Sequence, residues 1–327
     1  MDLHTLLANL QSPPILFFVL GFAAAIVRCE LEIPAPATKL ISLYLLWAIG
    51  FKGGVELHKS GLGTEAVTCL GLAIAFAVAV PLVAYAIARR RFAPPDAAAL
   101  AATYGSVSAV TFLTACNFLN QAKVEFGGHM VAAMALMESP AIVVAVLLLR
   151  RCAPQGSGDD KVVTMRELLR DAFLNGPVVM LLGSVAVGLA TGERGYAAMK
   201  PLCTDLFQGV LVFFLLDLGL LAGKRLPELR QNAVFLVPFG VLLPLANAAL
   251  ALCAAWLFGI ALGDAVLLMV LAASASYIAV PAALRLAIPS ARASIFVPAA
   301  LAVTFPFNVV AGLPLYLAAA TKVLVPG

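Results

Sequence analysis

Hydroxyl side chains gather at two places in the chain, each beside a residue that breaks helices. The first place reads TYGSVSAVT over residues 103–111, and the second reads SASYIAVP over residues 274–281. The predicted helix breakers are Gly105 and Pro281, because glycine loosens the backbone and proline removes an N–H donor. The hydroxyl groups belong to Ser106, Ser108, Thr111, Ser274 and Ser276.

An interrupted helix leaves N–H and C=O groups without partners, and inside a membrane these must come from protein or from a bound solute. Exposed N–H groups at the start of a half-helix favour an anion, and exposed carbonyls at the end of one favour a cation. The two clusters together therefore predict a site for a small anion beside Na⁺. Taken one at a time, each hydroxyl is more simply explained by a bond to its own backbone or by close helix packing.

Charged residues within apolar segments are the second chemical feature. A charge at the centre of a membrane costs about 2.5–3.5 kcal/mol on insertion scales, so it usually faces the interior of the bundle and marks a pathway. Glu138 precedes Pro140, and we expect it to bind the coupling ion, either Na⁺ or H⁺. The alternative is a buried hydrogen bond that stabilises a kink at Pro140. For Asp217 and Lys52, a functional role and an interfacial position remain open interpretations.

The composition identifies the elements that must position these groups. Of the 327 residues, 63% are hydrophobic and 12% are charged, and the mean hydropathy is +1.03. Apolar runs of about 20 residues recur, and each is long enough to cross a hydrocarbon layer of ~30 Å. We expect an all-α polytopic protein of the lipid bilayer that does not bind nucleic acid. No GxxxxGK[ST], HExxH or GxSxG motif is present, so neither an ATP motor nor an enzyme is expected.

Ten apolar segments are expected, separated by prolines and by charged loops. Fifteen of the 21 Lys and Arg residues follow odd-numbered segments, and the positive-inside rule makes that side cytoplasmic. Both termini are then extracytoplasmic, in a plasma (inner) membrane. The segments span residues 13–28, 37–54, 64–88, 97–119, 129–149, 172–191, 204–223, 233–258, 263–284 and 293–321.

Two pairs of matching stretches indicate an internal duplication. ESPAIVVA (138–145) matches TFPFNVVA (304–311), and GFKGGVEL (50–57) matches GLLAGKRL (219–226). Five segments in each copy place the second copy upside down in the membrane, an architecture found in many secondary transporters. The predicted parts are a first five-helix repeat, a cytoplasmic linker and a second, inverted repeat, over residues 1–150, 151–170 and 171–327.

Short motifs along nearly the whole chain resemble the sodium-dependent bicarbonate transporter family first known from cyanobacteria. The resemblance implies ten transmembrane helices in two inverted five-helix repeats, whose discontinuous helices 4 and 9 cross and hold bicarbonate and Na⁺. It also implies a homotrimer and, in cyanobacteria, a PII-like regulator on the cytoplasmic side. The motifs are LQSP (10–13), L-x-IP (31–34), G-x-x-GG (50–54), GSVSAVT (105–111), Glu138 with Pro140, LR (284–285), IPSA (288–291) and G-x-PLY (312–316).

The chain departs from the family pattern mainly at the second hydroxyl cluster. Tyr277 stands where the family has Asp, Val280 where it has Gly, and Leu221 where helix 7 carries an acid. Ala279 also stands where the family has Ser, so together these losses remove oxygen ligands and negative charge from where Na⁺ is expected, and a hard cation needs several oxygens. Either Na⁺ depends on the remaining groups or the coupling ion has changed, and Lys52, where the family usually has Ser, is a candidate tethered cation. The residues then predicted to bind the ion are Ser108, Glu138, Ser274 and Ser276.

The predicted function is secondary active import of a small anion, with Na⁺-dependent bicarbonate symport as the first hypothesis. One alternative is an H⁺-coupled or uncoupled carrier of another monoanion or small carboxylate. Another is a membrane sensor or scaffold that kept the fold and lost transport. No cofactor is expected other than Na⁺ as the coupling ion. The residues predicted to bind the substrate are Gly105, Ser106, Ser108, Thr111, Ser274, Ser276 and Tyr277.

Overall fold

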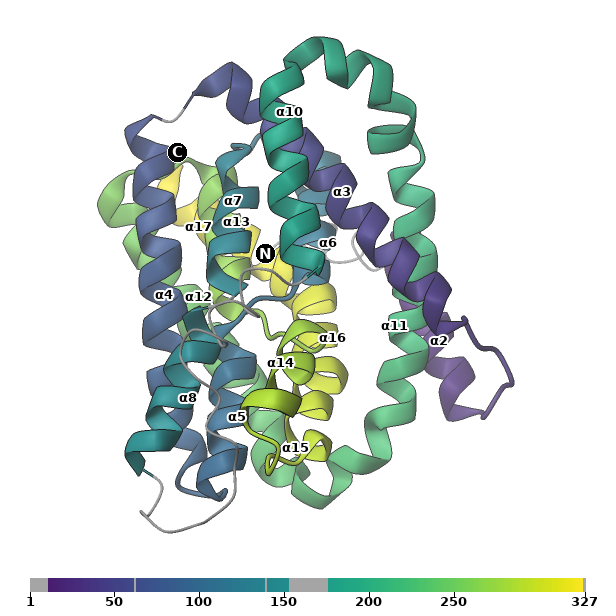
Figure 1. Ribbon diagram of the computed structural model, residues 1–327, viewed down its shortest axis with the longest axis vertical. Helices are drawn as coiled ribbons and strands as arrows, with labels where there is room; N and C mark the ends of the chain where they lie inside the picture. Colours follow the sequence, from purple (N-terminus) through teal and green to yellow (C-terminus); the bar gives the residue numbers. More distant parts are fainter. Residues whose placement is uncertain (1–10, 62, 139, 153–175, 326–327) are drawn as a thin grey trace.

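The computed structural model describes residues 11–61, 63–138, 140–152 and 176–325, and all regular structure in those ranges is helical (Figure 1). The α-helices are α2 (Pro13–Ile26), α3 (Ala35–Ser60), α4 (Thr64–Ala88), α5 (Pro94–Gly105), α6 (Ala109–Gln121), α7 (His129–Glu138), α8 (Pro140–Cys152), α10 (Gly176–Lys200), α11 (Phe207–Leu229), α12 (Ala233–Phe258), α13 (Leu262–Ala273), α14 (Ala279–Ala287), α15 (Ala293–Pro298), α16 (Phe305–Phe307) and α17 (Leu313–Leu324). Short 3₁₀ or π turns join some of them, namely η1 (Pro201–Asp205), η2 (Arg230–Asn232), η3 (Ala299–Thr304) and η4 (Asn308–Gly312).

Six stretches of described helix are long and apolar enough to cross a membrane, and the shorter helices α2 and α13 are also apolar. The longest stretch, Gly176–Phe258, has 83 residues, which would extend about 125 Å as one straight helix, several times a bilayer. It is instead divided into α10, α11 and α12, which run back and forth along the molecule (Figure 1). Gly192, at φ 54°, kinks α10 within its length, and the turn that begins at Pro201 separates α10 from α11.

The outer helices expose rows of apolar side chains, whereas the central ones expose almost nothing. Along α4, Val67, Ile74, Val78 and Leu82 are all exposed, which is the surface that lipid rather than water would cover. In contrast, all residues of α5 from Asp96 to Gly105 are buried, as are those of α13 after its first residue. The protein is therefore a helical membrane protein with α5 and α13 at its centre.

Glycine contacts join two pairs of helices almost backbone to backbone. Helix α3 packs against α10, where a Cβ added to Gly54 would lie 2.1 Å from the carbonyl oxygen of Val185. Helix α2 packs in the same way against α11, where a Cβ on Gly219 would lie 2.1 Å from the carbonyl oxygen of Phe18. Small residues at membrane helix contacts allow this approach. Gly54 and Gly219 belong to the two matched stretches around residues 50–57 and 219–226.

Two buried aspartates fix the starts of the central helices to their neighbours. Asp96, near the start of α5, accepts hydrogen bonds from the backbone N–H of Arg292 (2.9 Å) and from its guanidinium (2.6 Å). This contact raises the pKa of Arg292 above its ordinary value through the hydrogen bond and the opposite charge. Asp264, near the start of α13, accepts from the backbone N–H of Gly127 (2.6 Å), and its Oδ2 lies 3.2 Å from Nε2 of His129.

Candidate functional site

The two helix interruptions lie against each other in the buried core. Helix α5 ends at Gly105 and α6 begins at Ala109, while α13 ends at Ala273 and α14 begins at Ala279. The backbone N–H of Ser108 donates to Oγ of Ser274 (3.0 Å), and that of Ser276 donates to the carbonyl of Thr103 (2.8 Å). Each interruption therefore supplies hydrogen-bond partners that the other lacks.

Interruptions were predicted at both places, but Pro281 has a different role from the one expected. It lies in the first turn of α14, where proline is tolerated because the N–H it lacks would have no helical partner. The break itself occupies residues 274–278, which precede that turn. Gly105 ends α5 at a position without space for a side chain, since an added Cβ would lie 2.3 Å from Cγ of Pro81.

Most of the predicted hydroxyl groups bond to backbone near the interruptions. Oγ of Ser108 accepts from the N–H of Thr111 (3.2 Å) and so caps the start of α6. Oγ of Ser276 accepts from the N–H of Val280 (3.4 Å) at the start of α14. Oγ of Ser106 donates to the carbonyl of Glu138 (3.0 Å). The local role that a hydroxyl plays in an apolar helix is thus realised here, and any bound solute would share these groups with the backbone.

A small cavity of about 50 Å³ lies at the interruptions. Its polar lining includes Ser108, Glu138, Ser276 and Tyr277, so four of the predicted site residues share one space. The volume exceeds the roughly 10–15 Å³ that one water needs, and it suits an ion or a small anion rather than an organic metabolite. Of the other predicted residues, Gly105, Ser106, Thr111 and Ser274 surround the cavity without lining it.

Two polar groups in this lining lack the partners that buried groups usually have. The hydroxyl of Tyr277 is buried beside Ser108 and has no hydrogen bond of ordinary geometry among the described residues. Its ring packs edge-on against Phe305, with ring centroids 5.5 Å apart. The carboxylate of Glu138 takes part in no ion pair within the described ranges. A buried hydroxyl and a carboxylate of this kind are suited to water, a proton, a cation or a bound solute.

The backbone at the start of α6 offers further donors to the same cavity. Ala109 and Val110 line it, and their N–H groups donate to no residue in the described part of the chain. Ala279, the first residue of α14, also lines the cavity, and its N–H likewise donates to no residue in the described part of the chain. Free N–H groups at helix starts attract anions through both hydrogen bonding and the helix dipole.

Sequence reasoning missed two polar residues that support the interruptions from the last helical segment. Nδ2 of Asn308 donates to the carbonyl of Ala273 (2.8 Å), the final residue of α13. The Tyr104 hydroxyl donates to Oγ1 of Thr304 (2.8 Å), which itself donates to the carbonyl of Gly240 (2.8 Å). The matched stretch over residues 304–311 contains both Thr304 and Asn308, and that was the available signal.

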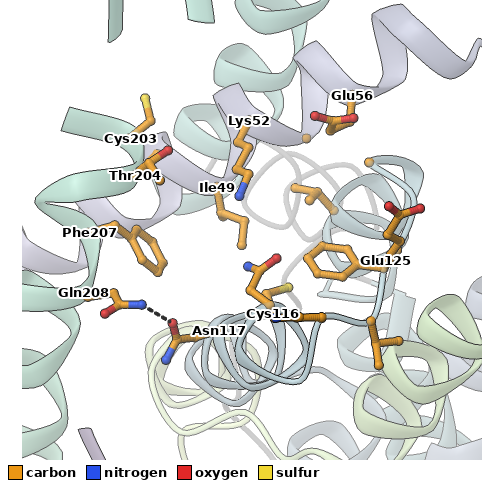
Figure 2. Close-up of a pocket in the computed structure, with 18 residues that line it drawn as sticks. Ile49, Lys52, Glu56, Cys116, Asn117, Glu125, Cys203, Thr204, Phe207 and Gln208 are labelled. Carbon is orange, nitrogen blue, oxygen red and sulfur yellow. Dashed lines mark hydrogen bonds between the residues drawn. The ribbon is translucent and has the colours of Figure 1, made fainter. Parts of the chain in front are cut away.

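The other two charged residues lie away from the small cavity. Asp217 accepts a hydrogen bond from Oγ1 of Thr38 (2.9 Å) and so joins α11 to α3. Lys52 lines a separate and much larger cavity of about 620 Å³ (Figure 2). In this conformation Lys52 therefore does not supply a tethered cation at the interruptions. No group of three or more His, Cys, Asp or Glu residues that could hold a metal occurs within the described ranges.

Comparison with known proteins gives one clear match, to a family of transporters. Among individually curated proteins, none matches the chain. The profile of the Na⁺-dependent bicarbonate transporter superfamily matches residues 13–321. That range includes both interruptions, Glu138 and nearly every described helix. The chain therefore belongs to the Na⁺-dependent bicarbonate transporter superfamily, whose members are transporters rather than enzymes.

Proposed function

We propose that this protein imports a small anion by secondary active transport, with bicarbonate as the substrate and Na⁺ as the coupling ion. The observation that carries the proposal is the meeting of two interrupted helices around a small cavity, whose lining includes a carboxylate and backbone N–H groups that have no partner among the described residues. Membership of the bicarbonate transporter superfamily supports the substrate and the ion.

The proposed architecture has ten membrane crossings in two inverted repeats, over residues 1–150 and 171–327. Reciprocal packing supports it, because α2 contacts α11 while α10 contacts α3, so the first segment of each half meets the second segment of the other. Ser106 and Ser274 also have almost the same backbone angles, with φ −85° in both and ψ 170° and 169°. Most of the expected linker, over residues 151–170, lies outside the described residues.

In the proposed site, the anion is bound by backbone N–H groups at the starts of α6 and α14. The hydroxyls of Ser108, Ser276 and Tyr277 are close enough to the cavity to add donors. The coupling cation lies beside the carboxylate of Glu138, with serine oxygens and backbone carbonyls as further ligands. Cation and anion then stabilise each other, which is the physical basis of symport. One part of the protein would move against the other around this site.

Uptake of labelled bicarbonate into proteoliposomes tests the proposal. The expected result is uptake driven by an inward Na⁺ gradient and absent from liposomes without protein, which control for diffusion of CO₂. Uptake that is indifferent to Na⁺ would remove the coupling ion from the proposal. Absence of protein-dependent bicarbonate uptake under any gradient would remove the substrate.

A second candidate function is H⁺-coupled or uncoupled transport of another monoanion or a small carboxylate. The carboxylate of Glu138, which has no ion pair within the described ranges, favours it, as does Tyr277, which stands where a carboxylate is expected. Uptake driven by a pH gradient and lost in Glu138→Gln would support this candidate. A sensor or scaffold without transport is the third candidate, and it would show anion-induced thermal stabilisation without flux through the membrane.

The proposed setting is a plasma (inner) membrane with both termini outside, because Lys and Arg are concentrated in the loops after odd-numbered segments. We also propose a homo-oligomer, a trimer by family resemblance, and retain a PII-like regulator as a partner to be tested. Mass photometry of the detergent-solubilised protein measures the oligomeric state directly, and a monomer would contradict this part of the proposal.

A further inference from the structure

The small cavity at the interruptions has two sides of different chemistry. One side consists of the two interruptions and the end of α7, which carry the hydroxyls and the carboxylate described above. The other side is formed by α3, α10 and α11, and among the described residues there Ser42 alone has a polar side chain. We call this second side the opposing wall, and its residues are Ser42, Leu46, Pro177, Leu181 and Phe214.

The large side chains of the opposing wall are buried and held in place by helix packing. Leu46, Leu181 and Phe214 are 5%, 1% and 1% exposed. Leu181 packs against Gly50 of α3, where an added Cβ would lie 2.7 Å from the Leu181 carbonyl oxygen and 3.4 Å from its Cδ1. Gly50 lies one turn beyond Leu46 on the same face of α3. Leu181 therefore cannot move back toward α3 without displacing the backbone of that helix.

The two sides impose an orientation on a bound anion. Its charged oxygens need hydrogen-bond donors, so they face the interruptions, and the rest of the anion faces the opposing wall. In bicarbonate the rest is a hydroxyl, which Ser42 can pair with because a serine hydroxyl both donates and accepts. In acetate it is a methyl group of similar size. In longer carboxylates it is a hydrocarbon chain, which would overlap the buried side chains of the opposing wall.

We propose that the opposing wall selects the anion, with Ser42 recognising the hydroxyl of bicarbonate and Leu181 limiting the length of the anion. The inference rests on the proposed function, because it takes the anion to bind in this cavity. A site that hydrogen-bonds a ligand hydroxyl discriminates against an analogue that lacks it, and a filled apolar pocket discriminates against an extra methylene by about tenfold or more. The substrate class is then a compact monoanion with a third oxygen, rather than a longer carboxylate.

Binding of the sodium salts of bicarbonate, acetate, propionate and butyrate tests the limit on length. Titrating the unfolding temperature of the detergent-solubilised protein, at one pH, Na⁺ concentration and ionic strength, gives an apparent Kd for each anion. Leu181→Ala is expected to strengthen the binding of propionate and butyrate relative to bicarbonate about tenfold or more. Leu182→Ala is the matched control, because Leu182 is the next residue of α10 and is exposed away from the cavity. Phe214→Leu opens the same wall from α11, so the test does not depend on one variant.

Ser42→Ala tests the recognition of the bicarbonate hydroxyl with the same titrations. The substitution is expected to weaken bicarbonate binding about tenfold and to leave acetate binding unchanged, because a methyl group needs no hydrogen-bond partner. Ser42→Thr keeps a hydroxyl and is expected to retain the preference for bicarbonate. If Ser42 had only a structural role, Ser42→Ala would change the apparent Kd of both anions alike, and that result would contradict the inference.

The limit on length is wrong if neither Leu181→Ala nor Phe214→Leu changes the relative affinities for the longer carboxylates. No response of the parent protein to any of the salts would overturn the inference as a whole. Uptake of bicarbonate into proteoliposomes decides the proposed function separately. If the affinity ratios shift as expected but the protein takes up no bicarbonate, the proposed function is wrong and the selecting wall stands. Uptake of bicarbonate together with unaltered affinity ratios leads to the reverse conclusion.

Discussion

Ser108 donates its backbone N–H to the side-chain oxygen of Ser274, although 166 residues separate them in the chain. The bond crosses from one interrupted helix to the other at the centre of the protein. Ser274 returns its own hydroxyl hydrogen to the carbonyl of Leu271 (3.0 Å), so one side chain serves both interruptions. The two interruptions therefore stabilise each other, and a substitution in one of them is expected to destabilise the other as well.

Ser274→Ala is expected to lower thermal stability. The substitution leaves the buried N–H of Ser108 without its acceptor, which costs about 1–3 kcal/mol. Fluorescence-monitored thermal unfolding in detergent measures the change. The control is Ser294→Ala, because Ser294 is exposed in α15 and takes part in no side-chain bond described above. Equal stability of the two variants would contradict the role assigned to Ser274.

Glu138→Gln is expected to reduce Na⁺-driven uptake about tenfold or more, because a charge-assisted contact contributes about 1.5–3 kcal/mol and the amide carries no charge. Glu138→Asp keeps the charge and is expected to retain part of the activity. Glu125→Gln serves as the control, since Glu125 lines only the larger cavity. Full Na⁺ dependence in Glu138→Gln would exclude Glu138 as the ligand of the coupling ion.

Tyr277→Phe and Tyr316→Phe separate a binding role from a structural one. Tyr277 has a buried hydroxyl without a hydrogen bond of ordinary geometry among the described residues, so its removal is expected to leave stability unchanged or slightly higher while weakening anion binding. The hydroxyl of Tyr316 donates to Oδ1 of Asn308 (2.7 Å), and its removal is expected to cost about 1 kcal/mol. Thermal unfolding with and without bicarbonate distinguishes them. If Tyr277→Phe binds as well as the parent protein, that hydroxyl is not part of the site.

Gly54→Ala is expected to destabilise the protein by about 1–3 kcal/mol, because the new methyl group would overlap a backbone carbonyl of α10 that cannot rotate away. Gly71→Ala provides the matched comparison. Gly71 lies within α4 with nothing near its missing Cβ, and alanine there is expected to be neutral or stabilising. Similar unfolding temperatures for both variants would show that α3 and α10 adjust more readily than their contact indicates.

The sequence was sufficient to predict the helical membrane class and the two interruptions, because apolar length and helix-breaking residues are local signals. It also led to Glu138, which lines the small cavity as a lone carboxylate within an apolar run. The contacts of Asp96 with Arg292 were not predictable in this way, since 196 residues separate them and no periodicity connects them. The local signal also misplaced Pro281, because proline is compatible with the first turn of a helix and so marks its start as well as its break.

The larger cavity illustrates a second limit of sequence reasoning. Lys52 was visible as an unusual charge, but its surroundings come from η1, α6 and the start of α11, all distant in the chain. Only the folded arrangement shows that it lies apart from the interruptions. Asn117 and Gln208 gave no signal at all, because single amides within apolar helices have many structural roles.

The glycine contacts of α2 with α11 and of α3 with α10 have a mechanical consequence. A sliding movement of either pair by a fraction of a turn would bring a carbon side chain to a position where only hydrogen fits. The two helices of each pair are therefore expected to move together as one rigid body rather than slide along each other. Relative movement of helices during a transport cycle must then occur where these rigid pairs contact other helices, such as the contacts of α3 with α7 and of α11 with α15.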